Sequence, residues 1–142
     1  MRPREAPIDP TGRERRTDAA LWLVAASAVW LTVWLSLFRD PPNPTHGHGI
    51  DKVEHALAYL VTTLAVLLAA VWRPGRGPGR FPAARWWIGG AALAAGALIE
   101  VLQSTMTTDR QGDVKDWLAE VVGVGLALLA LRALERRSPA PT

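Results

Sequence analysis

Four long apolar runs constrain the fold more than any other feature of this chain. They lie at 19–38, 56–72, 86–102 and 117–134, and each holds about 17 to 20 residues. As an α-helix, such a run extends roughly 25–30 Å, which is the thickness of a bilayer core. One run would fit a buried helix of a soluble protein, but four in 142 residues leave too few polar residues to cover them in water. The sequence therefore predicts an all-α, polytopic membrane protein with four transmembrane helices in an up-down bundle.

The expected helices divide the chain into an arm, one membrane domain and a tail. Residues 1–18 are polar, charged and interrupted by three prolines, so we expect a disordered basic arm. The transmembrane domain is expected over 19–134, with helices at about 19–38, 51–72, 86–103 and 113–134, followed by a tail at 135–142. Arg15 and Arg16 precede the first run as in a twin-arginine signal. However, that run is longer than a signal peptide's apolar region and lacks a small-x-small cleavage site, so we expect a retained helix.

The distribution of basic residues predicts the orientation in the membrane. Twelve of the sixteen fall in the first 18 residues, in the segment 73–85, or after residue 131, and the other four are Arg39, Lys52, Arg110 and Lys115. By the positive-inside rule, both termini are expected in the cytoplasm, and the loops at 39–55 and 103–116 outside. We therefore expect a multi-pass plasma-membrane protein. This asymmetry is typical of topology signals and lipid contacts rather than nucleic-acid binding.

The chain contains no cysteine, which excludes disulfides, thiol catalysis and zinc–thiolate sites. His46 and His48 stand two residues apart in a glycine-flanked loop without an HExxH pattern, and we interpret them as solvated rather than metal-binding.

A polar stripe descends the expected second helix. Asp51, His55 and Tyr59 follow one another at four-residue intervals, so they share a helix face, and Lys52 lies beside the first of them. Asp51 and Glu54 also suit the start of a helix, where acidic side chains favour the dipole. That explanation does not extend to His55 or Tyr59. A polar stripe that enters the membrane predicts polar partners inside the bundle.

The partners are expected on the third and fourth helices. Glu100 lies near the C-terminal end of its helix, where the dipole disfavours an anion, and Gln103 shares its face. Asp116 fits a helix-start acid as well as a site residue. Glu120 is about 10 Å past the expected cap at Asp113, beyond the reach of end effects. An isolated charge in hydrocarbon costs several kcal/mol or more, so these carboxylates require compensation by a cation or a proton.

Small residues accompany these carboxylates on the same helix faces. Ala92 and Gly96 precede Glu100, while Gly123 and Ala127 follow Glu120. Small residues at four-residue spacing allow transmembrane helices to approach closely. The sequence therefore predicts that the third helix and the fourth helix each pack closely against a neighbouring helix.

The polar motifs resemble those of the VanZ-like membrane proteins. The run from Asp51 to His55, followed by Tyr59, resembles the DKxxHxxxY signature of that family. The second motif of the family is matched by Glu100, Gln103, Arg110, Gly112, Asp116 and Gly123. Glu120 stands where the family often has Asn, and it adds a charge. The resemblance covers about residues 20–134 and implies a small bacterial membrane protein linked to the cell envelope and to teicoplanin resistance.

Together these observations predict an outward-facing polar pocket, with Arg110 and Lys52 available for phosphate or carboxylate groups. Its expected members are Asp51, Lys52, His55, Tyr59, Glu100, Gln103, Arg110, Asp116 and Glu120. The expected ligand is a lipid, a lipid-linked envelope precursor or an amphiphilic glycopeptide, without a cofactor.

Two other functions stay open. One is a membrane-embedded hydrolase or transferase that uses a His/carboxylate site, although we lean against an enzyme. In its metal-dependent form, the ligands would be His55, Glu100, Asp116 and Glu120. The other is a structural bundle that assembles with a membrane partner or with a second copy of the chain.

Overall fold

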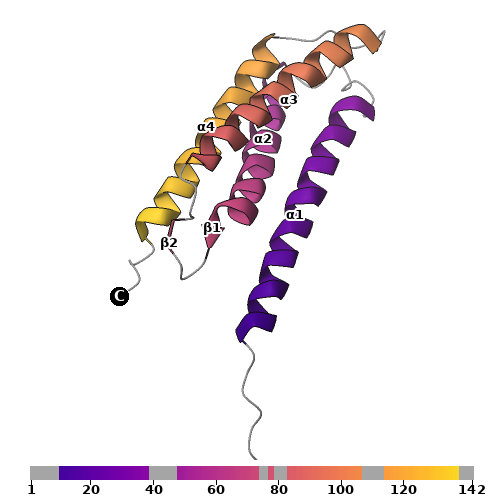
Figure 1. The fold of residues 1–142 in the computed structure, drawn as a ribbon. Helices are drawn as coiled ribbons and strands as arrows, with labels where there is room; N and C mark the ends of the chain where they lie inside the picture. The colour runs from indigo at the N-terminus through magenta and orange to yellow at the C-terminus, as the bar shows by residue number, and fades with distance from the viewer. Residues whose placement is uncertain (1–9, 39–47, 74–76, 79–82, 107–113, 138–142) are drawn as a thin grey trace, which may run out of the picture.

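The computed structural model describes residues 10–38, 48–73, 77–78, 83–106 and 114–137. These residues form α1 (Pro10–Phe38), α2 (His48–Ala70), α3 (Ala84–Met106) and α4 (Val114–Arg137), with short antiparallel strands β1 (Trp72–Arg73) and β2 (Gly77–Pro78) between α2 and α3. Consecutive helices run in opposite directions, so α1 begins and α4 ends at the same end of the bundle (Figure 1). All four described helices are long and apolar enough to cross a membrane, which confirms the predicted fold class.

The start of α1 corrects one predicted boundary. The helix begins at Pro10, so residues 10–18, which we expected to be disordered, are helical. Proline is tolerated in the first turn of a helix, and Glu14, Arg15 and Arg16 are good helix formers. The apolar span can therefore continue as a helix into the polar segment before it. Residues 1–9 lie outside the described part of the chain.

The other boundaries differ less from the prediction. The second helix begins at His48 rather than 51, and the third ends at Met106 rather than 103. The fourth helix continues to Arg137, so the first residues of the predicted tail are helical as well. Each extension contains polar or charged residues and carries the helix beyond its long apolar run.

The central helix is α2, which packs most extensively against α4 and next against α1, while α3 packs mainly on α4. Gly123 makes the contact between α2 and α4 possible. A Cβ atom there would overlap Ala56 O and lie 2.9 Å from Leu60 N, so the two backbones touch. This observation confirms the predicted close packing at Gly123 and identifies the neighbouring helix as α2.

The two ends of the bundle differ in polarity. Toward the end where the chain begins and finishes, Leu67 and Val71 of α2 pack with Ala127 and Leu131 of α4 in a fully apolar core. The carboxylates and His55 lie on the N-terminal halves of α2 and α4 and the C-terminal half of α3, which meet at the opposite end. The buried apolar core therefore lies toward one end of the bundle, and His55, Glu100 and Glu120 lie toward the other.

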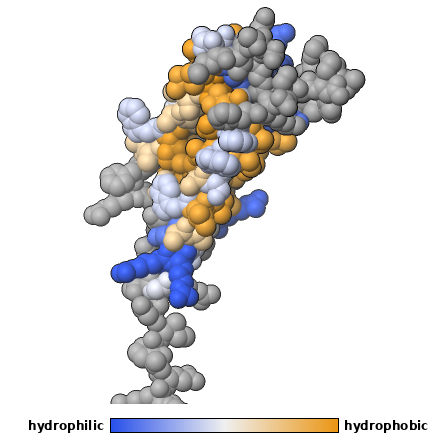
Figure 2. Space-filling model, turned by 90° about the vertical axis from the view of Figure 1, so that its right-hand side faces the viewer, coloured by the Kyte–Doolittle hydropathy of each residue, from blue (hydrophilic) through white to orange (hydrophobic). Residues whose placement is uncertain are grey.

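The lateral surface is apolar. Large hydrophobic side chains such as Trp30, Leu126 and Leu129 are exposed, and only 6% of the apolar window of α1 is buried. Figure 2 shows apolar residues over the middle of the molecule and hydrophilic ones toward the lower end. In water such a surface would drive association, whereas in a bilayer it meets lipid. The chain is therefore a multi-pass membrane protein.

Candidate functional site: a His/carboxylate cluster beside an apolar cavity

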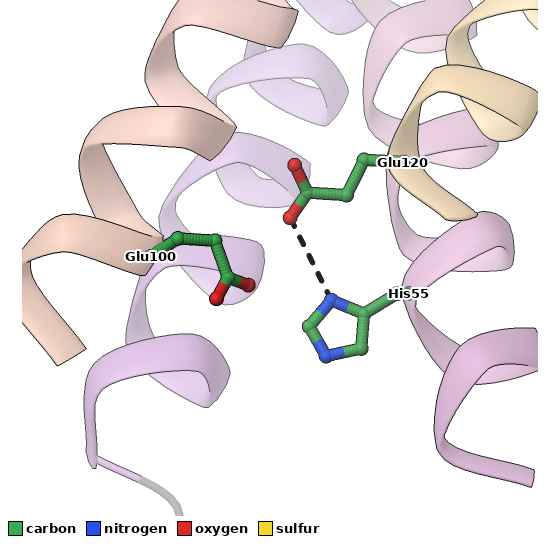
Figure 3. A group of neighbouring side chains, drawn as sticks. All are labelled: His55, Glu100 and Glu120. Atoms are coloured by element: carbon green, nitrogen blue, oxygen red, sulfur yellow. Dashed lines mark ion pairs between the residues drawn. The ribbon is translucent and has the colours of Figure 1, made fainter. Parts of the chain in front are cut away.

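Three side chains from three helices converge at the polar end. His55 of α2, Glu100 of α3 and Glu120 of α4 each offer a donor atom, and these atoms all lie within 4.8 Å of one another. Figure 3 shows the imidazole and both carboxylates turned toward a common point. The convergence occurs because Gly123, one turn after Glu120, brings α4 against the α2 backbone at Ala56. We call His55, Glu100 and Glu120 the three-residue cluster.

Glu120 is the most buried member of the cluster, with 1% of its surface exposed. His55 Nδ1 lies 3.6 Å from Glu120 Oε1, which is an ion pair if the imidazole is protonated. Oε2 is buried and accepts no hydrogen bond from the described residues. The Tyr59 hydroxyl interacts with the Glu120 carboxylate and, more weakly, with the Glu100 carboxylate. Glu120 therefore points into the cluster, and its Oε2 atom is available to accept a hydrogen bond or to bind a cation.

Gly96 provides the space for the Glu120 carboxylate. A Cβ atom at this position would overlap Glu120 Oε2 and lie 3.0 Å from the Tyr59 hydroxyl. The four-residue spacing between Gly96 and Glu100 had indicated a shared helix face, but it did not reveal that a carboxylate from another helix lies over the glycine. Any larger residue would push Glu120 away from its present position.

The predicted site residues Lys52 and Asp116 form an ion pair that bridges α2 and α4. Their side chains are 30% and 14% exposed, so the pair is partly buried. Asp116, which we had considered as a fourth metal ligand, lies outside the three-residue cluster. Its position in the first turn of α4 also agrees with a helix-start acid.

Gln103 makes a contact with α1. Its side chain is buried, and Nε2 donates a hydrogen bond of 2.7 Å to Ser36 O. The amide thus ties the end of α3 to α1, and its predicted contact with a ligand stays a prediction. The side chain of Asp51 and all of Arg110 lie outside the described residues, so their predicted roles also stay predictions.

The cluster brings two carboxylates and one imidazole together. Lys52 pairs with Asp116, while the donor atoms of His55, Glu100 and Glu120 lie within 4.8 Å of one another. Two carboxylates at 4.8 Å or less repel each other by at least about 3 kcal/mol at an effective dielectric constant near 20. A proton or a cation between them would relieve this repulsion. The cluster is therefore suited to proton transfer or to cation binding.

An apolar cavity of about 270 Å³ lies beside the cluster. It is bounded by α1 at Val29 and Val33, by α3 at Ala91 and Ala95, and by α2 at Tyr59, Thr62 and Thr63. The sparse contact between α1 and α3 leaves this space open. The apolar periodicity of α1 gave no signal for it, because residues on all sides of that helix are hydrophobic and do not reveal how it is placed.

Besides Tyr59, three threonines contribute polar atoms to the lining of this cavity. The hydroxyls of Thr32 and Thr62 lie 2.7 Å apart and join α1 to α2. The Thr63 hydroxyl is buried and makes no hydrogen bond with the described residues. None of the three was predicted as a site residue, because isolated threonines are common in apolar helices.

Comparison of the chain with protein-family models, curated proteins and solved structures finds no match. The resemblance to VanZ-like proteins therefore rests on the sequence motifs alone.

Proposed function

We propose that this membrane protein binds a membrane amphiphile, with the apolar chain in the cavity between α1 and α3 and the polar headgroup at the three-residue cluster. The observation that supports this proposal is the double position of Tyr59. Its side chain lines the cavity, and its hydroxyl interacts with Glu120. One molecule with an apolar tail and a polar end would fill both spaces at once.

The polar end would determine which amphiphile binds. Lipid tails surround the protein and are as apolar as the cavity walls, so transfer of a tail into the cavity gains little free energy. Contacts with the carboxylates, His55 and Tyr59 differ between headgroups and therefore supply selectivity. The buried Thr63 hydroxyl, which lines the cavity, offers one further hydrogen bond to a ligand with a polar atom along its chain.

The side of the membrane narrows the class of ligand. With both termini in the cytoplasm, as the basic residues predict, the cluster faces the extracytoplasmic side of the plasma membrane. Lipids and lipid-linked envelope precursors present their headgroups there, and amphiphilic glycopeptides arrive there. The VanZ-like motifs agree with such a ligand and with a contribution to glycopeptide resistance.

A matched pair of α3 variants tests amphiphile binding. Ala94 and Ala95 are neighbouring, exposed residues of α3, and of the two only Ala95 lines the cavity. We expect A95W to fill the cavity and to lose most of the lipid that co-purifies with the wild-type chain, whereas A94W retains it. Native mass spectrometry after mild detergent extraction measures the bound lipid. Equal retention by both variants, or no retained lipid on the wild type, would overturn the proposal.

A hydrolase or transferase is the second candidate, and the pairing of His55 with Glu120 favours it. At 3.6 Å, Nδ1 and Oε1 need only a small movement to exchange a proton, as general acid–base catalysis requires. An enzyme would consume a lipid from vesicles containing the protein, and H55A would abolish the loss. If mass spectrometry shows an unchanged lipid composition after prolonged incubation, the protein binds without turnover.

A further inference from the structure

We infer that the three-residue cluster of His55, Glu100 and Glu120 binds one divalent transition-metal ion. This inference deepens the proposed function, because it assigns a cofactor to the polar end of the same site. It concerns only the cluster, so it fails or succeeds independently of lipid in the cavity between α1 and α3.

The geometry requires only small side-chain movements. The three donor atoms lie within 4.8 Å of one another and come from three different helices. Zinc binds histidine nitrogen and carboxylate oxygen at about 2.0–2.2 Å, so two of its ligands are about 4 Å apart or closer. Rotation of the two long glutamate side chains would bring their oxygen atoms from the present spacing to the spacing that a zinc ion requires. The helices hold the donors in place, and Figure 3 shows the gap into which all three point.

The kinds of donor indicate the class of metal. Imidazole favours zinc, iron, copper and nickel, whereas carboxylates also accept manganese and magnesium. One imidazole with two carboxylates suits a first-row divalent ion better than calcium, which takes oxygen ligands only. Three protein ligands would leave at least one coordination position open. An oxygen atom of the amphiphile headgroup is suited to that position.

Glu120 gives independent support for a bound ion. Only 1% of its surface is exposed, and its Oε2 atom accepts no hydrogen bond from the described residues. Gly96 keeps the adjoining space free of a side chain. A divalent ion would use the available oxygen and would also balance the charges of Glu100 and Glu120.

Metal analysis of the purified full chain tests the inference. The protein is prepared without a histidine tag and with His46→Ala and His48→Ala, which remove the other two histidines of the chain as competing ligands. After treatment with EDTA and re-equilibration with Zn²⁺, we expect about one bound ion per chain by elemental analysis. H55A, E100Q and E120Q should each reduce the bound zinc at least tenfold. E54Q is the control, since Glu54 is exposed and adjacent to His55 but lies outside the cluster.

The outcomes separate clearly. Less than a tenth of an ion per wild-type chain, or equal zinc in the cluster variants and in E54Q, would overturn the inference. If the cluster variants fail to fold, X-ray absorption of the zinc-loaded parent protein decides the matter. One imidazole with oxygen ligands supports the inference, whereas any other ligand set contradicts it. Loss of zinc from E120Q with unchanged lipid on the same protein would leave the proposed lipid binding intact.

Discussion

At the scale of single residues, the sequence distinguished the carboxylates that end effects explain from those that they do not. Asp116 was open to a helix-start role, and it lies in the first turn of α4, paired with Lys52. Glu100 and Glu120 lacked such an explanation, and the structure brings both together with His55. The i, i+4 spacing that predicted the shared face of His55 and Tyr59 also holds, because both residues interact with Glu120.

The positions of other residues could not be predicted from spacing. The contact of Gln103 with Ser36 depends on where α1 stands relative to α3, and no local pattern specifies that distance. The same limit applies to Gly96, because its packing partner is a side chain from α4. Helical periodicity predicts the face on which a residue lies, but tertiary packing decides which helix faces it.

The first stability prediction separates a binding site from a structural network. In the presence of EDTA, E120Q should unfold at the same temperature as the wild type or a higher one, because the amide removes a carboxylate charge beside Glu100. Residues that serve function often cost stability in this way. D116N, by contrast, should lose up to about 1 kcal/mol, since it breaks a partly exposed ion pair with Lys52. Thermal unfolding of both variants in detergent provides the comparison. A larger loss for E120Q than for D116N would favour the structural bundle.

At the scale of helices, the number and type of elements followed from hydropathy, but their ends and neighbours did not. Apolar runs marked all four spans, whereas α1 continued to Pro10 through charged residues that are compatible with a helix. Small residues predicted close packing without indicating which pair of helices it joins. Gly123 lies on the backbone of α2, and Gly89 contacts Leu128 of α4.

The second stability prediction concerns the contact between α2 and α4. G123A should destabilise the protein by about 1–3 kcal/mol, because its Cβ would meet the α2 backbone, which cannot rotate away as a side chain can. G125A is the matched control, since the space beside Gly125 is open. Chemical or thermal unfolding of both variants in the same detergent measures the difference. Similar stabilities for G123A and G125A would show that the two helices are not in direct backbone contact.

At the scale of the whole molecule, the four described helices alternate in direction, so α1 begins and α4 ends on the same side of the bundle. The apolar core between α2 and α4 lies toward that side, as does the ion pair of Arg85 with Glu135 at 2.9 Å. The cluster lies toward the other side. Such a division allows one end of the bundle to maintain the fold while the other carries the carboxylates of Glu100 and Glu120 beside His55.

The orientation of the whole molecule is open to a direct test, because the chain contains no cysteine. The exposed residues Ser104 and Arg136 lie near opposite ends of the bundle. In intact bacterial cells, a membrane-impermeant maleimide should label S104C, while R136C should react only after lysis. The reverse pattern would place the cluster in the cytoplasm and exclude extracytoplasmic ligands.

The central claim is that one site combines the His/carboxylate cluster with the adjoining cavity. Native mass spectrometry of the wild-type chain, released from nanodiscs of mixed bacterial lipids, tests this claim most directly. We predict a dominant species that carries one divalent metal ion and one lipid, together with enrichment of particular headgroups relative to the nanodisc mixture. A bare chain without metal, carrying lipids only in the proportions of the surrounding bilayer, would contradict the account.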